Sequence, residues 1–250
     1  MIKINYPPSC RLGNYIIIYL LSQFFAEKYN LVSEEFPHNQ YNLKNDFNIN
    51  YFCGEKFFKE EILINDDNVL DLLSCDIIEK KIILQGGFFQ KKEIFSNSVF
   101  SEKVQKYIKP IKINDIKHDL FVHVRLGDVK NSKSLPYEYY KNQIKKINFN
   151  RGAISSDSLN DDLVKKLSKE FNLEFFENSP EYVIRYASQC KKIVLSSGSF
   201  SFLIGFFASN DSIKYYITNS VQEQKFNISP WCGDFFDSYV GKRGWEIYVD

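Results

Sequence analysis

Three short stretches of this 250-residue chain combine residue types that suit an anionic ligand. They read Arg-Leu-Gly-Asn-Tyr at 11–15, His-Val-Arg-Leu-Gly-Asp at 123–128 and Ser-Ser-Gly-Ser-Phe-Ser at 196–201. An arginine guanidinium matches phosphate oxygens with two parallel hydrogen bonds. Backbone N–H groups at the start of a helix carry partial positive charge and also bind phosphates. The three stretches therefore favour a phosphate-binding site.

The first stretch places Gly13 and Asn14 at the start of a helix expected over residues 14–29. Exposed N–H groups, the helix dipole and a side-chain amide would suit an anion there. The alternative is an asparagine N-cap preceded by a turn glycine, which needs no ligand. The residues alone leave both interpretations open.

In the second stretch, a strand predicted over residues 120–124 runs directly into a turn. Alternation along a strand places His123 and Arg125 on the same face. A guanidinium at the end of a buried strand is costly without a partner, and a phosphate group would provide one. An ion pair between Arg125 and Asp128 that closes the turn is the alternative.

The third stretch leaves a strand predicted over 193–195 and enters a helix predicted over 200–208. Hydroxyl and N–H groups around Ser197 and Ser199 would converge at the helix N-terminus and form an anion pocket. A serine N-cap beside a flexible glycine is the alternative. A catalytic serine is disfavoured, because the Gly-x-Ser-x-Gly pattern of hydrolases is absent.

The elements that must position these stretches alternate regularly in the second half of the chain. Further strands are expected at 152–156, 173–176 and 214–218, and further helices at 136–147, 161–171 and 180–189. Such alternation implies a parallel sheet covered by helices on both faces. In sheets of this kind ligands bind beyond the carboxyl ends of the strands, which is where the three stretches lie.

The first half of the chain is less regular. Alternation from Ile2 to Tyr6 predicts a short strand, residues 82–84 a buried strand, and residues 101–108 a short helix. Loops and short helices are expected between residues 38 and 70. The polar stretch around 110–118 divides the chain into two predicted domains, residues 1–112 and 113–250.

Charge and cysteine content bear on the class of partner and compartment. The 32 basic residues nearly balance the 31 acidic ones, and the lysines are scattered among acids, so nothing argues for nucleic acid. Five cysteines stand far apart without a Cys-x-x-Cys pair, which favours a reducing compartment and no structural metal.

The start of the chain lacks the apolar core of a signal peptide, and the longest apolar stretch, 15–26, is too short to span a bilayer. We therefore expect a cytoplasmic protein without a transmembrane segment.

Taken in order, the three stretches resemble the peptide motifs of the fucosyltransferase superfamily, most closely its α-1,2 type (glycosyltransferase family 11). That family carries a Gly-x-Gly-Asn-Gln loop, a His-x-Arg-Arg-Gly-Asp strand end and a Ser-Asn-Ser-x-Phe-Ser turn. Leu-Pro-x-x-Tyr-Tyr at 135–140 and Ser-Ser-Asp at 155–157 resemble two further segments of the family. All five stretches occur in the family's order.

The resemblance implies a GT-B-like α/β fold, in which two Rossmann-like domains with parallel sheets face a central cleft. Residues 1–112 would form the acceptor-side domain and residues 113–250 the nucleotide-sugar-binding domain. The implied activity is inverting transfer of a fucosyl residue from GDP-fucose to a glycan hydroxyl. The implied enzyme needs no metal and no cofactor, and no Asp-x-Asp metal motif stands in a suitable loop.

The resemblance also assigns roles to individual residues. Arg125 would grip the diphosphate and stabilise the leaving GDP, and Asp128 is the nearest carboxylate that could activate the acceptor, unless Arg125 or backbone occupies it. Asp157 would accept hydrogen bonds from the guanine edge. The remaining donor-binding residues would be His123, which positions the nucleotide, Ser197, Ser199 and Phe200, which line the phosphates, and Gly13 and Asn14 from the first domain.

The chain departs from the family pattern at several positions. Leu126 replaces the second arginine, while Arg11 and Tyr15 flank the first Gly-Asn pair in place of glycine and glutamine. We therefore consider two alternative functions. The chain could transfer another sugar, such as a rhamnosyl or hexosyl group, or it could bind nucleotide or glycan without catalysis. A purely structural α/β protein is the remaining alternative.

Overall fold

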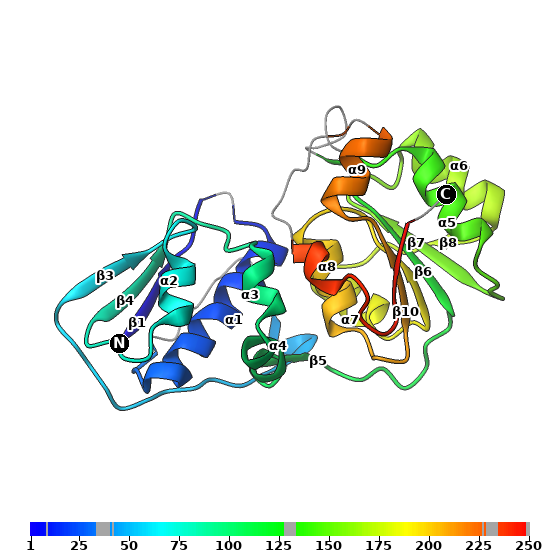
Figure 1. Cartoon of the computed structure of the whole chain (residues 1–250). Helices are drawn as coiled ribbons and strands as arrows, with labels where there is room; N and C mark the ends of the chain where they lie inside the picture. The colour runs from blue at the N-terminus through cyan, green and yellow to red at the C-terminus, as the bar shows by residue number, and fades with distance from the viewer. Residues whose placement is uncertain are drawn as a thin grey trace. The chain divides into compact units, whose positions relative to one another are not determined.

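The computed structural model describes residues 1–8, 10–33, 41, 43–127, 134–226, 228 and 235–248. The chain forms two compact units, Met1–Lys109 and Pro110–Asp250 (Figure 1). Each unit contains a sheet of parallel strands together with helices, which confirms the predicted α/β class. The division falls a few residues before the boundary placed at residues 112 and 113 from the sequence.

The first unit is built on a three-stranded parallel sheet with the strand order β1-β4-β3. Helix α1 packs most of its length into the unit, and its last turn ends at Asn30, which adopts the left-handed conformation at φ 53°. A small second sheet pairs β2 with β5. The elements are β1 (Ile2–Asn5), α1 (Leu12–Tyr29), η1 (Leu43–Asn45), β2 (Phe47–Ile49), β3 (Glu61–Ile64), α2 (Val69–Ser74), β4 (Lys81–Gln85), α3 (Lys92–Ser96), α4 (Ser98–Val104) and β5 (Ile108–Pro110).

Two predicted helices of this unit begin elsewhere than expected. Helix α1 begins at Leu12 after an Arg11 N-cap, so Asn14 lies inside the first turn and the predicted asparagine N-cap is wrong. The helix predicted over 101–108 is also displaced. The Asn97 side chain accepts a hydrogen bond from the Phe100 N–H at 3.0 Å and starts α4 at Ser98. This helix ends at Val104, and Ile108–Pro110 form the strand β5.

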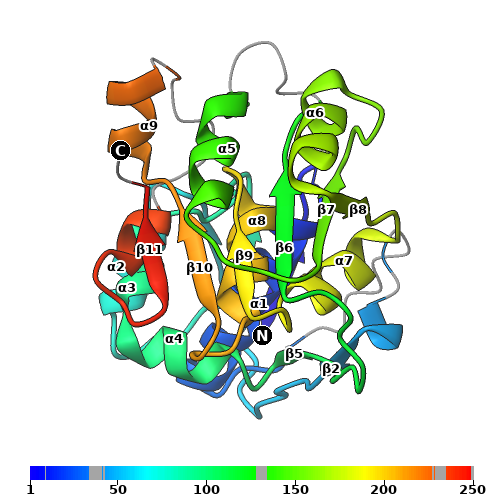
Figure 2. The same ribbon diagram turned by 90° about the vertical axis from the view of Figure 1, so that its right-hand side faces the viewer.

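The second unit is built on a six-stranded sheet with the order β11-β10-β9-β6-β7-β8, in which every pair is parallel (Figure 2). The central strand β6 is buried along its whole length, as a strand covered on both faces must be. The elements are β6 (Leu120–Val124), α5 (Tyr137–Lys145), β7 (Gly152–Ser156), α6 (Asp162–Phe171), β8 (Leu173–Phe175), α7 (Pro180–Ala187), β9 (Lys192–Val194), α8 (Ser199–Phe207), β10 (Ile213–Tyr216), α9 (Asn219–Phe226), η3 (Phe235–Tyr239) and β11 (Trp245–Ile247).

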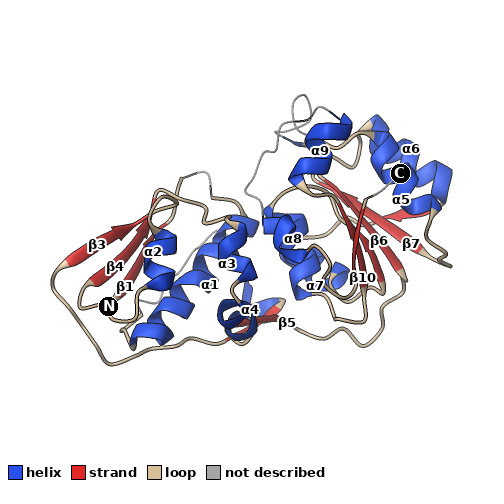
Figure 3. Cartoon of the chain, viewed as in Figure 1, coloured by secondary structure: helices blue, strands red, loops and turns tan. Residues whose placement is uncertain are grey.

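Helices cover both faces of this sheet, as the sequence predicts (Figure 3). Val122 and its neighbours on one face of β6 pack in a core cluster with Tyr140 of α5 and Leu167 of α6. On the opposite face, the ring of Phe121 contacts Tyr186 of α7, and His123 contacts Phe200 of α8. Among the helices that the structure describes, none combines the length and the apolar content of a membrane-spanning segment.

Candidate functional site

The carboxyl end of β6 brings two of the predicted residues together. Val124 pairs with Ser156 of β7, so the next residue of each strand, Arg125 and Asp157, leaves the sheet side by side. The Arg125 guanidinium forms an ion pair with the Asp157 carboxylate, and the two side chains are 17% and 29% exposed. Asp157 Oδ1 also accepts a hydrogen bond from the Leu126 N–H at 2.9 Å.

The carboxylate that pairs with Arg125 is not the one that the sequence suggested. The alternative prediction paired Arg125 with Asp128, whereas Asp157 of the neighbouring strand is the carboxylate that contacts the guanidinium. Asp128 itself lies outside the residues that the structure describes, so its predicted catalytic role stays a prediction. Asp157, assigned to the guanine edge, also holds the arginine assigned to the diphosphate.

The glycine of the second stretch is required by this geometry. Gly127 has a positive φ of 36°, and a Cβ built there would clash with Asp157 Oδ2 and stand 3.3 Å from the Arg125 guanidinium. Any side chain at this position would therefore strain the backbone and press on the ion pair. Glycine allows the turn to pass directly beside the two charged groups.

The third stretch lies at the same carboxyl end of the sheet, because β9 is parallel and hydrogen-bonded to β6. Gly198, with a φ of 100°, is the N-cap of α8 and makes no side-chain cap, so the predicted serine N-cap is wrong. Among the described residues no hydrogen-bond partner is found for the hydroxyls of Ser197 and Ser199. Phe200 lies against the His123 ring, with 4.9 Å between the ring centroids.

Buried hydroxyl groups tie these strand ends together. His123 Nδ1 lies 2.5 Å from Ser201 Oγ, and the Ser196 N–H donates to the same oxygen at 3.1 Å. Ser196 Oγ in turn accepts from the Arg125 N–H at 3.2 Å and lies 2.8 Å from the Tyr140 hydroxyl. Burial, and next the positive charge of Arg125, lower the pKa of His123 to about 3, so this imidazole is neutral at pH 7.

An open pocket of about 500 Å³ adjoins Asp157 at the carboxyl ends of β7 and β8. Its lining is polar apart from one aromatic ring and one leucine, and it comprises Ser155, Ser156, Asp157, Ser158, Leu159, Asn160, Asp161, Phe176, Glu177 and Asn178. The α6 N-cap on its rim is Asp161, whose carboxylate accepts from the Leu163 N–H at 2.9 Å. The pocket has the position expected for a ligand of a parallel sheet.

The structure thus groups most of the predicted site residues of the second unit. His123, Arg125, Asp157 and Phe200 are linked by contacts, and Ser197 and Ser199 lie at the start of α8, beside the same strand ends.

Gly13 and Asn14 belong to the first unit, where both lie in the first turn of α1. The Asn14 side chain is engaged there, because its Oδ1 accepts a hydrogen bond from Gln90 Nε2 at 2.5 Å.

The sequence did not single out the residues that support this group. Ser196, Ser201 and Tyr140 are parts of the quoted motifs but had no role, since only the fold shows that their hydroxyls meet. Phe176 and Glu177 line the pocket, and they are the last residue of the strand predicted over 173–176 and the residue after it, which is the signal that would have found them.

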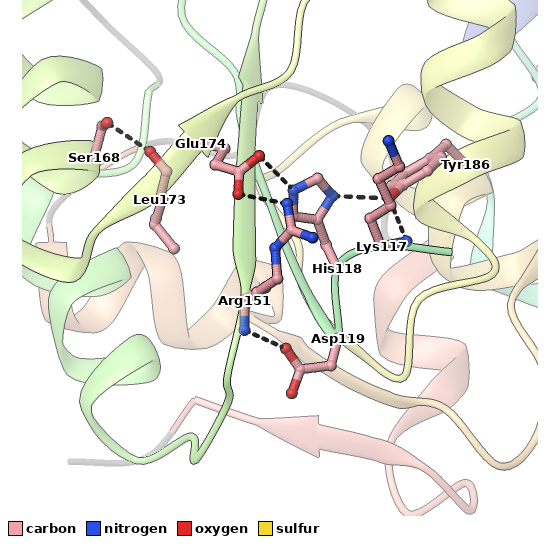
Figure 4. A network of polar contacts seen from close by, with 8 residues as sticks. All are labelled: Lys117, His118, Asp119, Arg151, Ser168, Leu173, Glu174 and Tyr186. Carbon is pink, nitrogen blue, oxygen red and sulfur yellow. Dashed lines mark hydrogen bonds and ion pairs between the residues drawn. The ribbon is translucent and has the colours of Figure 1, made fainter. Parts of the chain in front are cut away.

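A second polar cluster lies at the opposite, amino end of the same strands (Figure 4). His118 Nε2 lies 3.1 Å from Glu174 Oε2, and its Nδ1 lies 2.8 Å from the Tyr186 hydroxyl. The other oxygen of Glu174 accepts from Arg151 at 2.8 Å. The Asp119 carboxylate accepts the Arg151 N–H at 2.9 Å, and such hydrogen bonds lower the pKa of that carboxyl. This cluster joins β6, β7, β8 and α7 at the amino end of the strands, away from the pocket.

Comparisons with known proteins do not assign the chain to a family. No protein-family model matches this chain, and no curated protein matches it significantly. Within the described part of the chain, no three side chains of His, Cys, Asp or Glu gather in a way that could hold a metal ion.

Proposed function

We propose that the chain is an inverting glycosyltransferase that moves a fucosyl residue from GDP-fucose to a glycan hydroxyl. The observation that carries this proposal is the meeting of Arg125, Asp157 and the start of α8 at the carboxyl end of the central strands. A guanidinium, two serine hydroxyls and a helix N-terminus are the groups that bind a diphosphate. The adjoining pocket, with its polar wall and Phe176, offers room for a nucleobase.

Arg125 would supply most of the electrostatic catalysis. Transfer breaks the bond between the anomeric carbon and a phosphate oxygen, so negative charge grows on the leaving GDP. A fixed guanidinium stabilises that charge more in the transition state than in the ground state. Asp157 holds the guanidinium in place before the donor binds, which reduces the ordering that binding must impose.

The proposal includes the two-domain GT-B arrangement that the motif resemblance implies. In it Pro110–Asp250 is the donor domain and Met1–Lys109 is the acceptor-side domain, which would contribute Gly13 and Asn14 to the pyrophosphate side. Asp128 is the proposed acceptor base.

Replacing Arg125 tests the proposed activity. Both Arg125→Ala and Arg125→Lys are expected to lower turnover of GDP-fucose by about 10²-fold or more, because neither side chain presents a guanidinium to the leaving group. Release of GDP is measured across a panel of neutral glycan acceptors. Arg151→Lys is the control and should retain turnover, because this arginine lies at the opposite, amino end of the strands. Unchanged turnover in both Arg125 variants would remove this residue from the mechanism.

A silent nucleotide-binding protein is the second candidate. It is favoured by Leu126, which stands where the family carries a second arginine and is only 1% exposed in the core. A protein of this kind would bind GDP, yet it would release none from GDP-fucose with any acceptor of the panel.

A further inference from the structure

Ser201 is a fully buried residue of α8 whose hydroxyl lies between two polar groups of the candidate site. Its Oγ lies 2.5 Å from His123 Nδ1 and 3.1 Å from the Ser196 nitrogen. The His123 side chain is nearly as buried, at 4% exposure. In such a setting each proton needs an acceptor, because a buried polar group without a hydrogen bond has lost its hydration and gained nothing in return.

Counting the protons fixes the direction of each hydrogen bond. The Ser196 N–H can only donate, so it occupies a lone pair of Ser201 Oγ. The hydroxyl has one proton, and among the described residues its one remaining neighbour is His123 Nδ1. If Nδ1 carried a proton, the hydroxyl proton would be buried without an acceptor. Ser201 therefore donates to His123.

The surroundings of the ring also disfavour a second proton on it. The charged group near His123 is the guanidinium of Arg125, which directly follows β6, and the neighbours of the ring from α8 are Ser201 and the Phe200 ring. No carboxylate of the described residues forms an ion pair with His123. An imidazolium would therefore be buried and also repelled by the guanidinium of Arg125.

We propose that Ser201 is a positioning residue that holds His123 as the neutral tautomer with its proton on Nε2. No hydrogen-bond partner is found for Nε2 within the described part of the chain, so the Nε2–H remains available to donate to a phosphate oxygen of the ligand. The phosphate contact rests on the proposed function, whereas the tautomer does not. The site would then hold a diphosphate with one cationic side chain and a neutral N–H donor, rather than with two cations.

The tautomer is tested by nuclear magnetic resonance of the full chain labelled with ¹⁵N-histidine at pH 7. The chain has three histidines, and a His123→Asn variant assigns the signals of His123. We expect a protonated Nε2 and an unprotonated Nδ1. A proton on Nδ1, or a doubly protonated ring, would overturn the proposal.

The Ser201→Ala variant tests the positioning role. We expect His123 to populate both neutral tautomers and the affinity for GDP to fall about tenfold, the equivalent of one hydrogen bond. Ser212→Ala is the matched control, since Ser212 is also a buried serine with a hydrogen bond, donated to the Cys190 carbonyl at 2.9 Å. It should leave both readouts unchanged. An unaltered tautomer in Ser201→Ala would refute the role of Ser201.

The two proposals fail in different ways. Addition of GDP to the wild-type protein should shift the Nε2 signal of His123. If GDP does not bind at all, the proposed function fails while the tautomer result still decides the role of Ser201. If GDP binds without any change at His123, the phosphate contact proposed for Nε2 is wrong.

Discussion

At the scale of single residues, the site depends on how closely the chain passes the Arg125–Asp157 ion pair. Gly127 makes this approach possible, because its positive φ and missing side chain leave the carboxylate undisturbed. The sequence identified Arg125 and Asp157 separately. The sequence could not pair them, because they lie far apart in the chain: Asp157, which also accepts the N–H of Leu126, follows that residue by 31 positions. Only the register of β6 against β7 brings Arg125 and Asp157 together.

Gly127→Ala is therefore expected to weaken GDP binding by about tenfold or more, because its Cβ displaces Asp157 and with it the guanidinium. Gly241→Ala is the matched control: Gly241 also has a positive φ, of 74°, but a Cβ there meets no atom within 4 Å. Both variants should lose about 1–2 kcal/mol of stability from backbone strain. Calorimetric titration and urea unfolding measure the two effects, and equal GDP affinities in the two variants would contradict the account.

At the scale of elements, the two ends of the six-stranded sheet have different tasks. The amino end carries the cluster around His118 and Glu174, which links strands to α7, whereas the carboxyl end carries the candidate site. Each end contains a buried tyrosine whose hydroxyl bridges elements and contacts the local polar cluster: Tyr186 at the amino end and Tyr140 at the carboxyl end.

The pair of variants Tyr186→Phe and Tyr140→Phe separates these tasks. Each removes one buried hydroxyl and should destabilise the fold by about 1–2 kcal/mol, measured by urea unfolding. Only Tyr140→Phe should also weaken GDP binding, because Ser196, which it contacts, accepts the Arg125 N–H. If Tyr186→Phe weakened GDP binding instead, the amino end of the strands would also contribute to the binding site, contrary to this prediction.

The sequence predicted the long elements of the second unit well, and the physical reason is plain. The strand 120–124 is apolar at every position except His123, as a sheet covered on both faces favours, and helices such as 162–171 carry apolar residues at helical spacing. The strands β2, β5 and β11 have only three residues each and stand outside the regular alternation of strands and helices that located the equally short β8 and β9. Their pairing depends on contacts distant in the chain.

At the scale of the whole molecule, the chain consists of two compact α/β units, of which the second contains the grouped site residues. Most of the donor-site residues named from the sequence meet within that unit, and the role of the first unit rests on the proposed two-domain arrangement. Binding of a nucleoside diphosphate is thus the property on which the account depends.

The most direct test is calorimetric titration of the full chain with GDP, UDP and pyrophosphate. We predict that GDP binds more tightly than UDP, that pyrophosphate binds weakly, and that Arg125→Ala weakens the binding of all three by about tenfold or more. If none of the three binds to the wild-type protein, or if Arg125→Ala binds GDP as tightly as the wild type does, the proposed donor site is wrong.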